Sequence, residues 1–152
     1  MVDIVSPETR SRMMAGIRGK HTKPELLVRR ALFAAGFRFR LHRKDLPGAP
    51  DIVLPKWKVA IFVHGCFWHQ HPNCKLAKVP ASRPEFWMKK LAGNIERDRR
   101  ASAELNASGW RVLTIWECAT RDRALVADLP SVLTSWIQGS QPIGEIALAL
   151  PG

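Results

Sequence analysis

The pattern of apolar and polar residues predicts a helix followed by a strand in the first part of the chain. Apolar side chains recur at helical spacing between residues 22 and 36. Thr22 and Glu25 have the spacing of a capping box at the start of this helix, and Gly36 suits its end. Residues 37–42 then alternate between apolar and polar side chains, which is typical of a half-buried strand.

Two more strands are predicted before a loop that is rich in cysteine and histidine. Residues 51–54 and 57–63 are these strands, and the continuous apolar run over 59–63 indicates burial on both faces. The loop over 63–74 has neither a helical nor a strand period, yet it holds two of the three cysteines and three of the five histidines. We expect the rest of the chain to support this loop or to present it to a partner.

The second half of the chain predicts a helix, a strand and a final helical region. The helix over 82–106 opens with a second capping box at Ser82, and a buried strand over 110–116 follows it. The last helical region, 122–137, is expected to be divided by Pro130. The side chains expected to face inward from the helix over 82–106 are Phe86, Leu91, Ile95 and Leu105.

The order of these elements predicts an α/β fold with a central mixed β-sheet flanked by helices. One domain over 1–152 accounts for the whole chain, because the sequence has neither an internal repeat nor a linker. A short arginine-bearing helix is predicted over 6–17, and the segment 1–20 is a candidate flexible arm that orders on a partner. The tail over 139–152 shows no clear period.

The excess of basic over acidic residues indicates an anionic partner. Lys and Arg outnumber Asp and Glu by 24 to 13, which gives a formal net charge of +11. Such an excess favours nucleic acid as the partner; a protein that is merely soluble and basic is the alternative. Nothing resembles a signal peptide or a membrane-spanning apolar run, so we expect a cytoplasmic protein that does not bind membranes.

The cysteines predict a metal site. Cys66, His71 and Cys74 lie in one loop, and Cys118 arrives at the end of a predicted strand. Three thiolates and one imidazole suit a closed, tetrahedral structural zinc site, and an odd number of cysteines argues against a disulfide framework. The alternative is that Cys118 is a small buried apolar residue and that the loop cysteines are free.

Two histidines and one aspartate predict a second, catalytic site. His64 and His69 are not needed by zinc, and a neutral imidazole can take a proton from water. Asp51 opens the strand next to the one that ends near Val63, so its carboxylate and a strand-end carbonyl are candidate Mg²⁺ ligands. Such an ion can activate water for phosphoryl transfer. The alternative is that Asp51 is only a turn residue after Pro50.

Several motifs together resemble the very short patch repair (Vsr) endonucleases. The likeness spans roughly residues 6 to 138, and the His-Gly-Cys-Phe-Trp-His run at 64–69 is its most specific part. The other segments that carry it are Pro50-Asp51, Lys78-Val79-Pro80-Ala81 with Glu85-Phe86-Trp87, Asn94 with Glu96-Arg97-Asp98, and Gly109-Trp110-Arg111-Val112 with Trp116-Glu117-Cys118.

The resemblance implies a restriction-endonuclease-like core with a structural zinc ion. It implies a Mg²⁺-dependent, monomeric enzyme that nicks one strand of double-stranded DNA on the 5′ side of the thymine in a T·G mismatch. Such mismatches arise when 5-methylcytosine deaminates, and a mismatch-repair ATPase is a further candidate partner. Two hypotheses compete with this one: a non-catalytic, zinc-stabilised mismatch-binding module, and a restriction enzyme acting on matched DNA.

The resemblance also implies roles for individual residues. Asp51 and the backbone carbonyl of Val63 would hold Mg²⁺, His69 would be the general base and His64 an additional active-site group. Glu25 would contact the water shell of the metal, although its capping position explains it equally well. The residues implied to bind zinc are Cys66, His71, Cys74 and Cys118, and those implied to wedge into the base stack are Phe67, Trp68 and Trp87.

Some of these assignments can also be weighed from the residues alone. Phe67 and Trp68 lie among candidate metal ligands, so both cannot belong to an apolar core stripe. An apolar wedge costs less at a mismatched step, which is already weakened. Trp87 lies in a predicted helix and could simply be a core residue. The chain departs from the family pattern at Val63, where threonine is expected, and in a zinc loop that is one residue longer.

Overall fold

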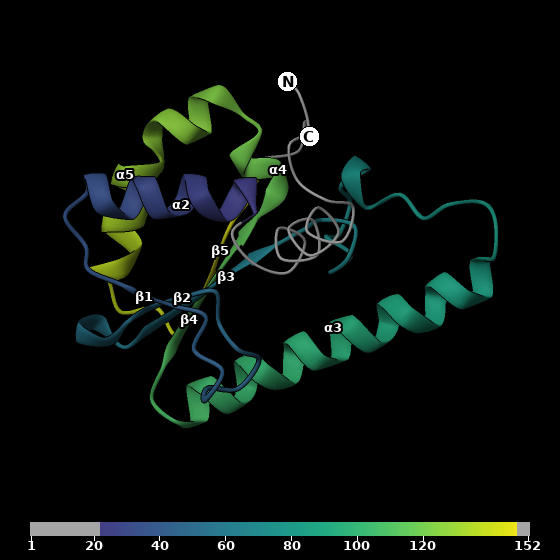
Figure 1. Ribbon diagram of the computed structural model, residues 1–152, viewed down its shortest axis with the longest axis horizontal. Coiled ribbons are helices and arrows are strands. Elements are labelled where there is room, and N and C mark those ends of the chain that lie inside the picture. The colour runs from purple at the N-terminus through teal and green to yellow at the C-terminus, as the bar shows by residue number, and fades with distance from the viewer. Residues whose placement is uncertain (1–21, 149–152) are drawn as a thin grey trace, which may run out of the picture.

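The described residues, 22–148 of the computed structural model, are built around a mixed five-stranded sheet in the order β1-β2-β3-β4-β5 (Figure 1). The strands are β1 (Arg40–Leu41), β2 (Ile52–Leu54), β3 (Val59–His64), β4 (Arg111–Trp116) and β5 (Ile143–Ile146). The pairs β1–β2 and β2–β3 are antiparallel, whereas β3–β4 and β4–β5 are parallel. The predicted mixed sheet is therefore confirmed. The predicted strand over 37–42 is shorter than expected, because only Arg40 and Leu41 pair with β2.

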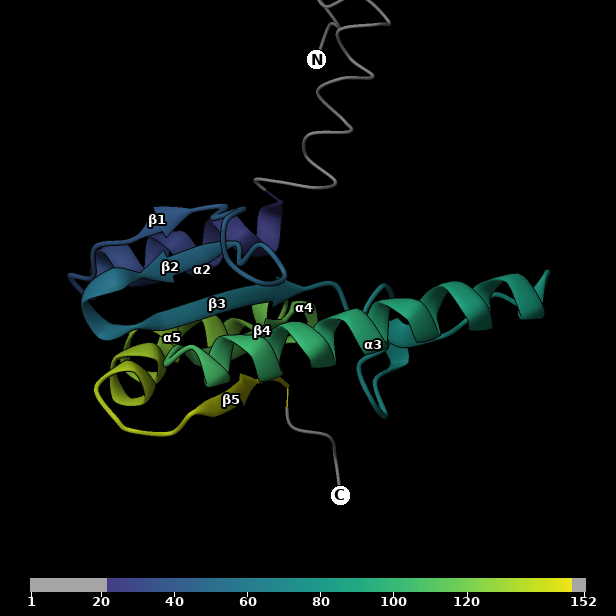
Figure 2. The same ribbon diagram turned by 90° about the horizontal axis from the view of Figure 1, so that it is seen from below.

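The helices cover both faces of the sheet. They are α2 (Lys23–Ala34), α3 (Pro84–Ala107), the short α4 (Glu117–Thr120) and α5 (Arg123–Ile137), with 3₁₀ turns η1 (Pro55–Trp57) and η2 (Lys75–Ala77). Figures 1 and 2 show α2, α4 and α5 together on one side and α3 alone on the other. Among the helices of the described region, none is long and apolar enough to cross a membrane.

The apolar run in β3 is buried on both faces, as its composition predicts. Ile61 belongs to the larger core, together with residues of α2 and α5. Phe62, the next residue, packs instead with Leu105 of α3. Successive side chains of a strand point to opposite faces, so a strand between two layers of helices needs apolar residues at every position. This strand ends at His64, which places the ligand-rich loop at one edge of the sheet.

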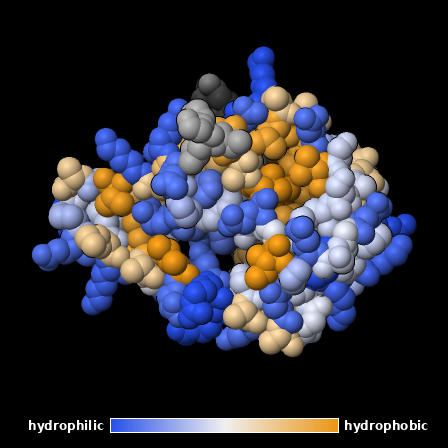
Figure 3. Space-filling view, turned by 180° about the vertical axis from the view of Figure 1, so that it is seen from behind, coloured by the Kyte–Doolittle hydropathy of each residue, from blue (hydrophilic) through white to orange (hydrophobic). Residues whose placement is uncertain are grey.

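Helix α3 differs from the prediction at its start and along its outer part. Ser82 is not the N-cap; Arg83 holds that position in a left-handed conformation without a side-chain capping bond. Phe86 and Ile95, expected to face inward, are 43% and 45% exposed, whereas Leu91 is buried. The start of α3 extends well past the sheet (Figure 2), so Phe86 in its first turn has no layer to pack against. Ile95 is not explained in this way, because Leu91 is nearer the projecting end and is buried. Figure 3 shows apolar atoms among hydrophilic ones on this projecting part.

Helix α5 runs through Pro130 without a break, which corrects the expected division. Proline removes one backbone donor and disfavours a helix interior. The apolar face of α5 offsets this cost, because Leu129, Leu133 and Ile137 are all buried in the main core. The Thr134 hydroxyl also donates to the Pro130 carbonyl at 2.8 Å.

The tail contains a strand that the sequence pattern does not reveal. β5 pairs in parallel with β4, although Ile143 at its start is exposed. Arg111 holds the connection from α5 to β5, because its guanidinium donates to the carbonyls of Trp136, Ile137 and Gln141 at 2.7–3.0 Å. A long-range side-chain contact therefore positions this strand, and no local period announces it. The predicted helix over 6–17 and the arm over 1–20 lie outside the described residues.

Replacing Arg111 with alanine is expected to lower the free energy of unfolding by about 2–4 kcal/mol, since three carbonyls lose a charged donor at once. Urea denaturation monitored by circular dichroism measures this change. Arg99→Ala is the matched control, because Arg99 makes an exposed ion pair with Glu96 and should leave stability nearly unchanged. Equal stability of the two variants would contradict the role given to Arg111.

Candidate active site

The start of β2 and the end of β3 meet because these strands are antiparallel. Asp51 directly precedes β2, and its Oδ2 accepts a hydrogen bond of 2.8 Å from the backbone N–H of Val63. Burial raises the pKa of Asp51 to about 6, and the negative charge of Glu25 also raises it, while the Val63 N–H lowers it. The expected adjacency of Asp51 and residue 63 is confirmed. A cation bound at the Asp51 carboxylate would stabilise its ionised form, which desolvation disfavours.

Glu25 joins Asp51 from helix α2. Thr22 is the N-cap, and its hydroxyl accepts from the Glu25 backbone N–H, so this half of the predicted capping box is present. The Glu25 carboxylate turns inward instead of back to the cap and is 2% exposed. It forms an ion pair with Arg29, and both of its oxygens lie 3.1 Å from Nε2 of His42. Capping alone therefore does not explain this side chain.

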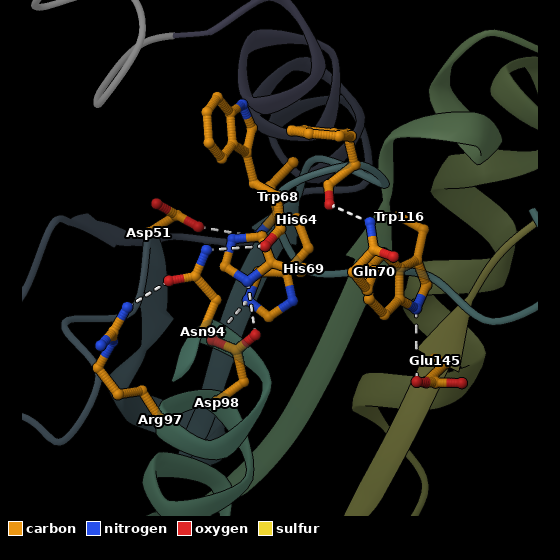
Figure 4. A network of polar contacts seen from close by, with 12 residues as sticks. Asp51, His64, Trp68, His69, Gln70, Asn94, Arg97, Asp98, Trp116 and Glu145 are labelled. Carbon is orange, nitrogen blue, oxygen red and sulfur yellow. Dashed lines mark hydrogen bonds and ion pairs between the residues drawn. The ribbon is translucent and has the colours of Figure 1, made fainter. Parts of the chain in front are cut away.

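His64 and His69 form a stacked pair, with ring centroids 3.7 Å apart and planes 3° from parallel (Figure 4). Nδ1 of His69 lies 2.5 Å from Oδ2 of Asp98, and Nε2 of His64 lies 4.0 Å from the other oxygen of the same carboxylate. A carboxylate only accepts hydrogen bonds, so Nδ1 of His69 carries the proton in this contact. Its Nε2 is then the basic nitrogen, as a general base requires.

The two stacked imidazoles differ in burial, since His64 is buried and His69 is partly exposed. Burial lowers the pKa of His64 to about 3, and the neighbouring His69 lowers it further. His64 is therefore neutral at working pH, while His69 is the imidazole paired with a carboxylate. His64 thus supplies a polar, uncharged ring that stacks on the imidazole bonded to Asp98.

Asp98 and His42 are site residues to which the sequence reasoning gave no role. Asp98 lies in α3, 29 residues from His69, and His42 lies 17 residues from Glu25. Asp98 belongs to a motif that carries the family resemblance, which is the one signal that could have identified it. No comparable signal marks His42, which follows a two-residue strand. Asn94, one helical turn before Asp98, donates to the Trp68 carbonyl at 2.9 Å (Figure 4).

The predicted zinc ligands come together. One ligand atom from each of Cys66, His71, Cys74 and Cys118 lies within 4.8 Å of the others. Nδ1 of His71 is 3.7 Å from the Cys66 sulfur and 3.6 Å from the Cys118 sulfur. A tetrahedral zinc site has metal–sulfur bonds of about 2.3 Å and metal–nitrogen bonds of about 2.0–2.1 Å. At the tetrahedral angle these bonds place a ligand sulfur and a ligand nitrogen about 3.6 Å apart. The donor set and its spacing fit zinc.

The protonation chemistry of the cluster also fits a cation. Burial raises the pKa of Cys66 to about 12, so its thiol would stay protonated unless a cation were bound. Burial lowers the pKa of His71, which favours the neutral imidazole that a metal needs. The backbone N–H of Cys118 points to the Cys66 sulfur at 3.4 Å. Cys118 lies in α4 immediately after β4, and so it ties the loop to the sheet, although not from the strand itself.

Three aromatic side chains cluster beside the histidine pair. The ring of Phe67 lies 5.0 Å from Trp68 and 5.3 Å from Trp87, and the two tryptophans are 6.0 Å apart. Trp68 is 48% exposed, and Trp87 is partly exposed on the projecting part of α3. Trp87 therefore does not belong to the buried core of the described residues. Exposed aromatic rings held by one another form a rigid apolar surface next to candidate catalytic groups.

Comparison with known proteins identifies relatives along nearly the whole chain. The family described as "DNA mismatch endonuclease Vsr" matches residues 2–76. The type II nicking enzyme V.XorIIP of Xanthomonas oryzae is 49% identical over 134 residues, covering 88% of this chain and 98% of the relative. The DNA mismatch endonuclease Vsr of Escherichia coli is 43% identical over 148 residues, covering 96% and 94%. The chain therefore belongs to the Vsr family of DNA mismatch endonucleases.

Proposed function

We propose that this chain is a Mg²⁺-dependent endonuclease that nicks one strand of duplex DNA on the 5′ side of the thymine in a T·G mismatch. One observation carries this proposal beyond family membership. The partly buried carboxylate of Asp51 lies at the same sheet edge as His69, whose Nδ1 is held by Asp98 at 2.5 Å. A metal-binding carboxylate beside an oriented imidazole suits hydrolysis of a phosphodiester and is not required for binding alone.

Asp51, with the backbone carbonyl of Val63, would hold the divalent ion, and Glu25 would contact its water shell. Mg²⁺ prefers oxygen ligands and keeps several of its waters, which suits one or two carboxylates plus a carbonyl. When bound, the ion would supply charge stabilisation for the phosphoryl transition state. Valine at position 63 removes any hydroxyl contribution, and the carbonyl role is independent of the side chain.

His69 acts as the general base of the proposed reaction. Asp98 holds its Nδ1 proton, so Nε2 is available to accept a proton from the attacking water. His64 stacks on this ring and stays neutral, so it does not repel a protonated His69. We assign His64 a polar contact with the scissile phosphate.

The zinc cluster has a structural role in this proposal. The set Cys66, His71, Cys74 and Cys118 leaves no open position, as expected for structural and not catalytic zinc. It would hold the loop that carries His69 on one side and Phe67 and Trp68 on the other. The mixed sheet with α2 and α3 on opposite faces is compatible with a restriction-endonuclease-like core, which we propose for this chain.

Phe67, Trp68 and Trp87 form the wedge that enters the base stack beside the mismatch. Replacing Trp68 with alanine is expected to weaken binding to a T·G duplex about 10–100-fold, because stacking of one base on an aromatic ring contributes about 1–3 kcal/mol. Binding to a matched duplex should change little. Fluorescence anisotropy measures both affinities when an Asp51→Ala background prevents cleavage. Met88→Ala is the matched control, since Met88 is 68% exposed on the same projecting part of α3 and lies outside the wedge.

The proposed function is tested with a panel of end-labelled duplexes, matched and singly mismatched, incubated with Mg²⁺ and the full chain. Nicking is expected in T·G duplexes, on the thymine strand, and is expected to disappear in Asp51→Ala. Binding without any cleavage would favour a mismatch-binding module. Double-strand cleavage of matched duplexes would favour a restriction enzyme. Either result would overturn the proposal.

A further inference from the structure

His42 occupies an unusual position beside the proposed metal site. It follows β1, and its backbone N–H donates to the carbonyl of Asp51 at 3.0 Å. Its backbone adopts a left-handed conformation, with φ of 49°. Such a conformation is unfavourable for a residue with a Cβ and persists where the surroundings require it. At His42 it directs the imidazole across the sheet edge toward Glu25 of α2.

The imidazole of His42 holds a carboxylate that would otherwise be poorly placed. Nε2 lies 3.1 Å from each oxygen of Glu25, so it bonds to the carboxylate symmetrically. The Glu25 side chain is 2% exposed, and water therefore cannot take over this contact. Arg29, one turn along α2, supplies the balancing positive charge. A buried carboxylate needs such partners to stay charged and ordered.

His42 also connects the two carboxylates. Its backbone is bonded to Asp51 and its side chain to Glu25, and ligand atoms of all three residues lie within 4.8 Å of one another. Glu25 is buried and Asp51 is partly buried, so their negative charges repel each other at this separation, and the His42 bridge limits how far they can move apart. His42, which follows β1, therefore links the positions of these two acidic residues.

We propose that His42 is a positioning residue of the divalent-metal site, which fixes the Glu25 carboxylate opposite Asp51 and thereby raises the affinity of the site for its ion. This inference rests on the proposed function. Hydrogen-bond partners of groups around a metal typically change its affinity 10–100-fold when they are removed. The side chain acts as a hydrogen-bond donor to Glu25 and not as a metal ligand, because Nε2 is directed at both oxygens of that carboxylate.

The test measures metal affinity without DNA and without turnover. Mn²⁺, which also prefers oxygen ligands, is titrated into the zinc-loaded full chain, and the free ion is followed by electron paramagnetic resonance. We expect His42→Ala to bind Mn²⁺ about 10–100-fold more weakly than the wild type. His42→Gln, whose amide can still donate to Glu25, should stay within about threefold. Arg40→Ala, an exposed change in β1, is the matched control and should equal the wild type.

The outcomes separate the possible failures. Wild-type affinity in His42→Ala would overturn the positioning role while leaving the metal site intact. An equal loss in His42→Gln and His42→Ala would also overturn it, because hydrogen bonding would not then be the cause. A purely structural role would lower the melting temperature of His42→Ala and leave its Mn²⁺ affinity unchanged. No binding by the wild type, or full binding by Asp51→Ala, would overturn the metal site of the proposed function itself.

Discussion

Replacing Asp51 with asparagine is expected to reduce nicking of a T·G duplex by at least about 10³-fold and, at the same time, to stabilise the metal-free protein. The loss follows from removal of the proposed metal-binding charge, since about 4 kcal/mol of transition-state stabilisation corresponds to about three powers of ten. The amide oxygen of the introduced asparagine can still accept from the Val63 N–H, so the local fold should survive. Single-turnover nicking assays measure the first effect.

The stability change follows from the raised pKa of Asp51. Burial raises the pKa of this carboxyl from 3.8 to about 6, so its ionised form is disfavoured in the folded protein. Metal-free wild-type protein therefore loses stability as the pH rises from about 4 through about 6, and asparagine avoids this loss. The variant should exceed the wild type by about 3 kcal/mol above pH 7, with the difference shrinking toward zero near pH 4.

Urea denaturation in chelator at several pH values measures this difference. Added Mg²⁺ should stabilise the wild type and not the variant, because the ion binds the ionised carboxylate of the folded state. Because a proton and the ion compete for the same carboxylate, the Mg²⁺ concentration that half-saturates nicking by the wild type should rise as the pH falls below about 6. If the variant were less stable than the metal-free wild type at pH 8, the raised pKa assigned to Asp51 would be wrong.

Loss of the zinc site is expected to have the second large effect. His71→Ala should contain less than one zinc per chain, and its free energy of unfolding should fall by at least about 4 kcal/mol, because zinc binding contributes directly to folding. Nicking should fall with it, since the same loop carries His69 and the wedge. Metal analysis by mass spectrometry and thermal denaturation provide the two measurements.

His69→Ala is the matched control for the zinc prediction. It removes an imidazole from the same loop, but one that pairs with Asp98 and not with the cysteines. This variant should keep about one zinc and near wild-type stability while losing nicking by about 10²–10⁴-fold. If His69→Ala lost its zinc and His71→Ala kept it, the division of the loop into a zinc part and a catalytic part would be wrong.

Much of the fold could be predicted because its signals are local. The apolar runs at 59–63 and 110–116 identify the two central strands, and Gly36 and Gly109, both with positive φ, mark the ends of α2 and α3. Local rules misassigned Ser82 as a cap, Pro130 as a break, and Phe86 and Ile95 as inward-facing. Each of these depends on what packs against the helix, which a local pattern does not contain.

The candidate site divides in the same way. Cysteine and histidine spacing predicted the candidate zinc set, whose ligand atoms do come together, because a short loop around an ion constrains the spacing of its own ligands. The two loop histidines left over, and the predicted strand that Asp51 opens, pointed to His64, His69 and Asp51. The tertiary structure alone decided that Asp98 of α3 meets His69 and that His42 reaches Glu25, since these pairs meet through the sheet register and helix packing across 29 and 17 residues. It also decided β5, which pairs with β4 although its own pattern does not announce a strand, and whose connection from α5 contacts Arg111. The sequence by itself thus predicted most of the candidate ligands and catalytic groups. The tertiary structure decided how each is oriented and which partners it meets, because orientation depends on neighbours that are distant along the chain.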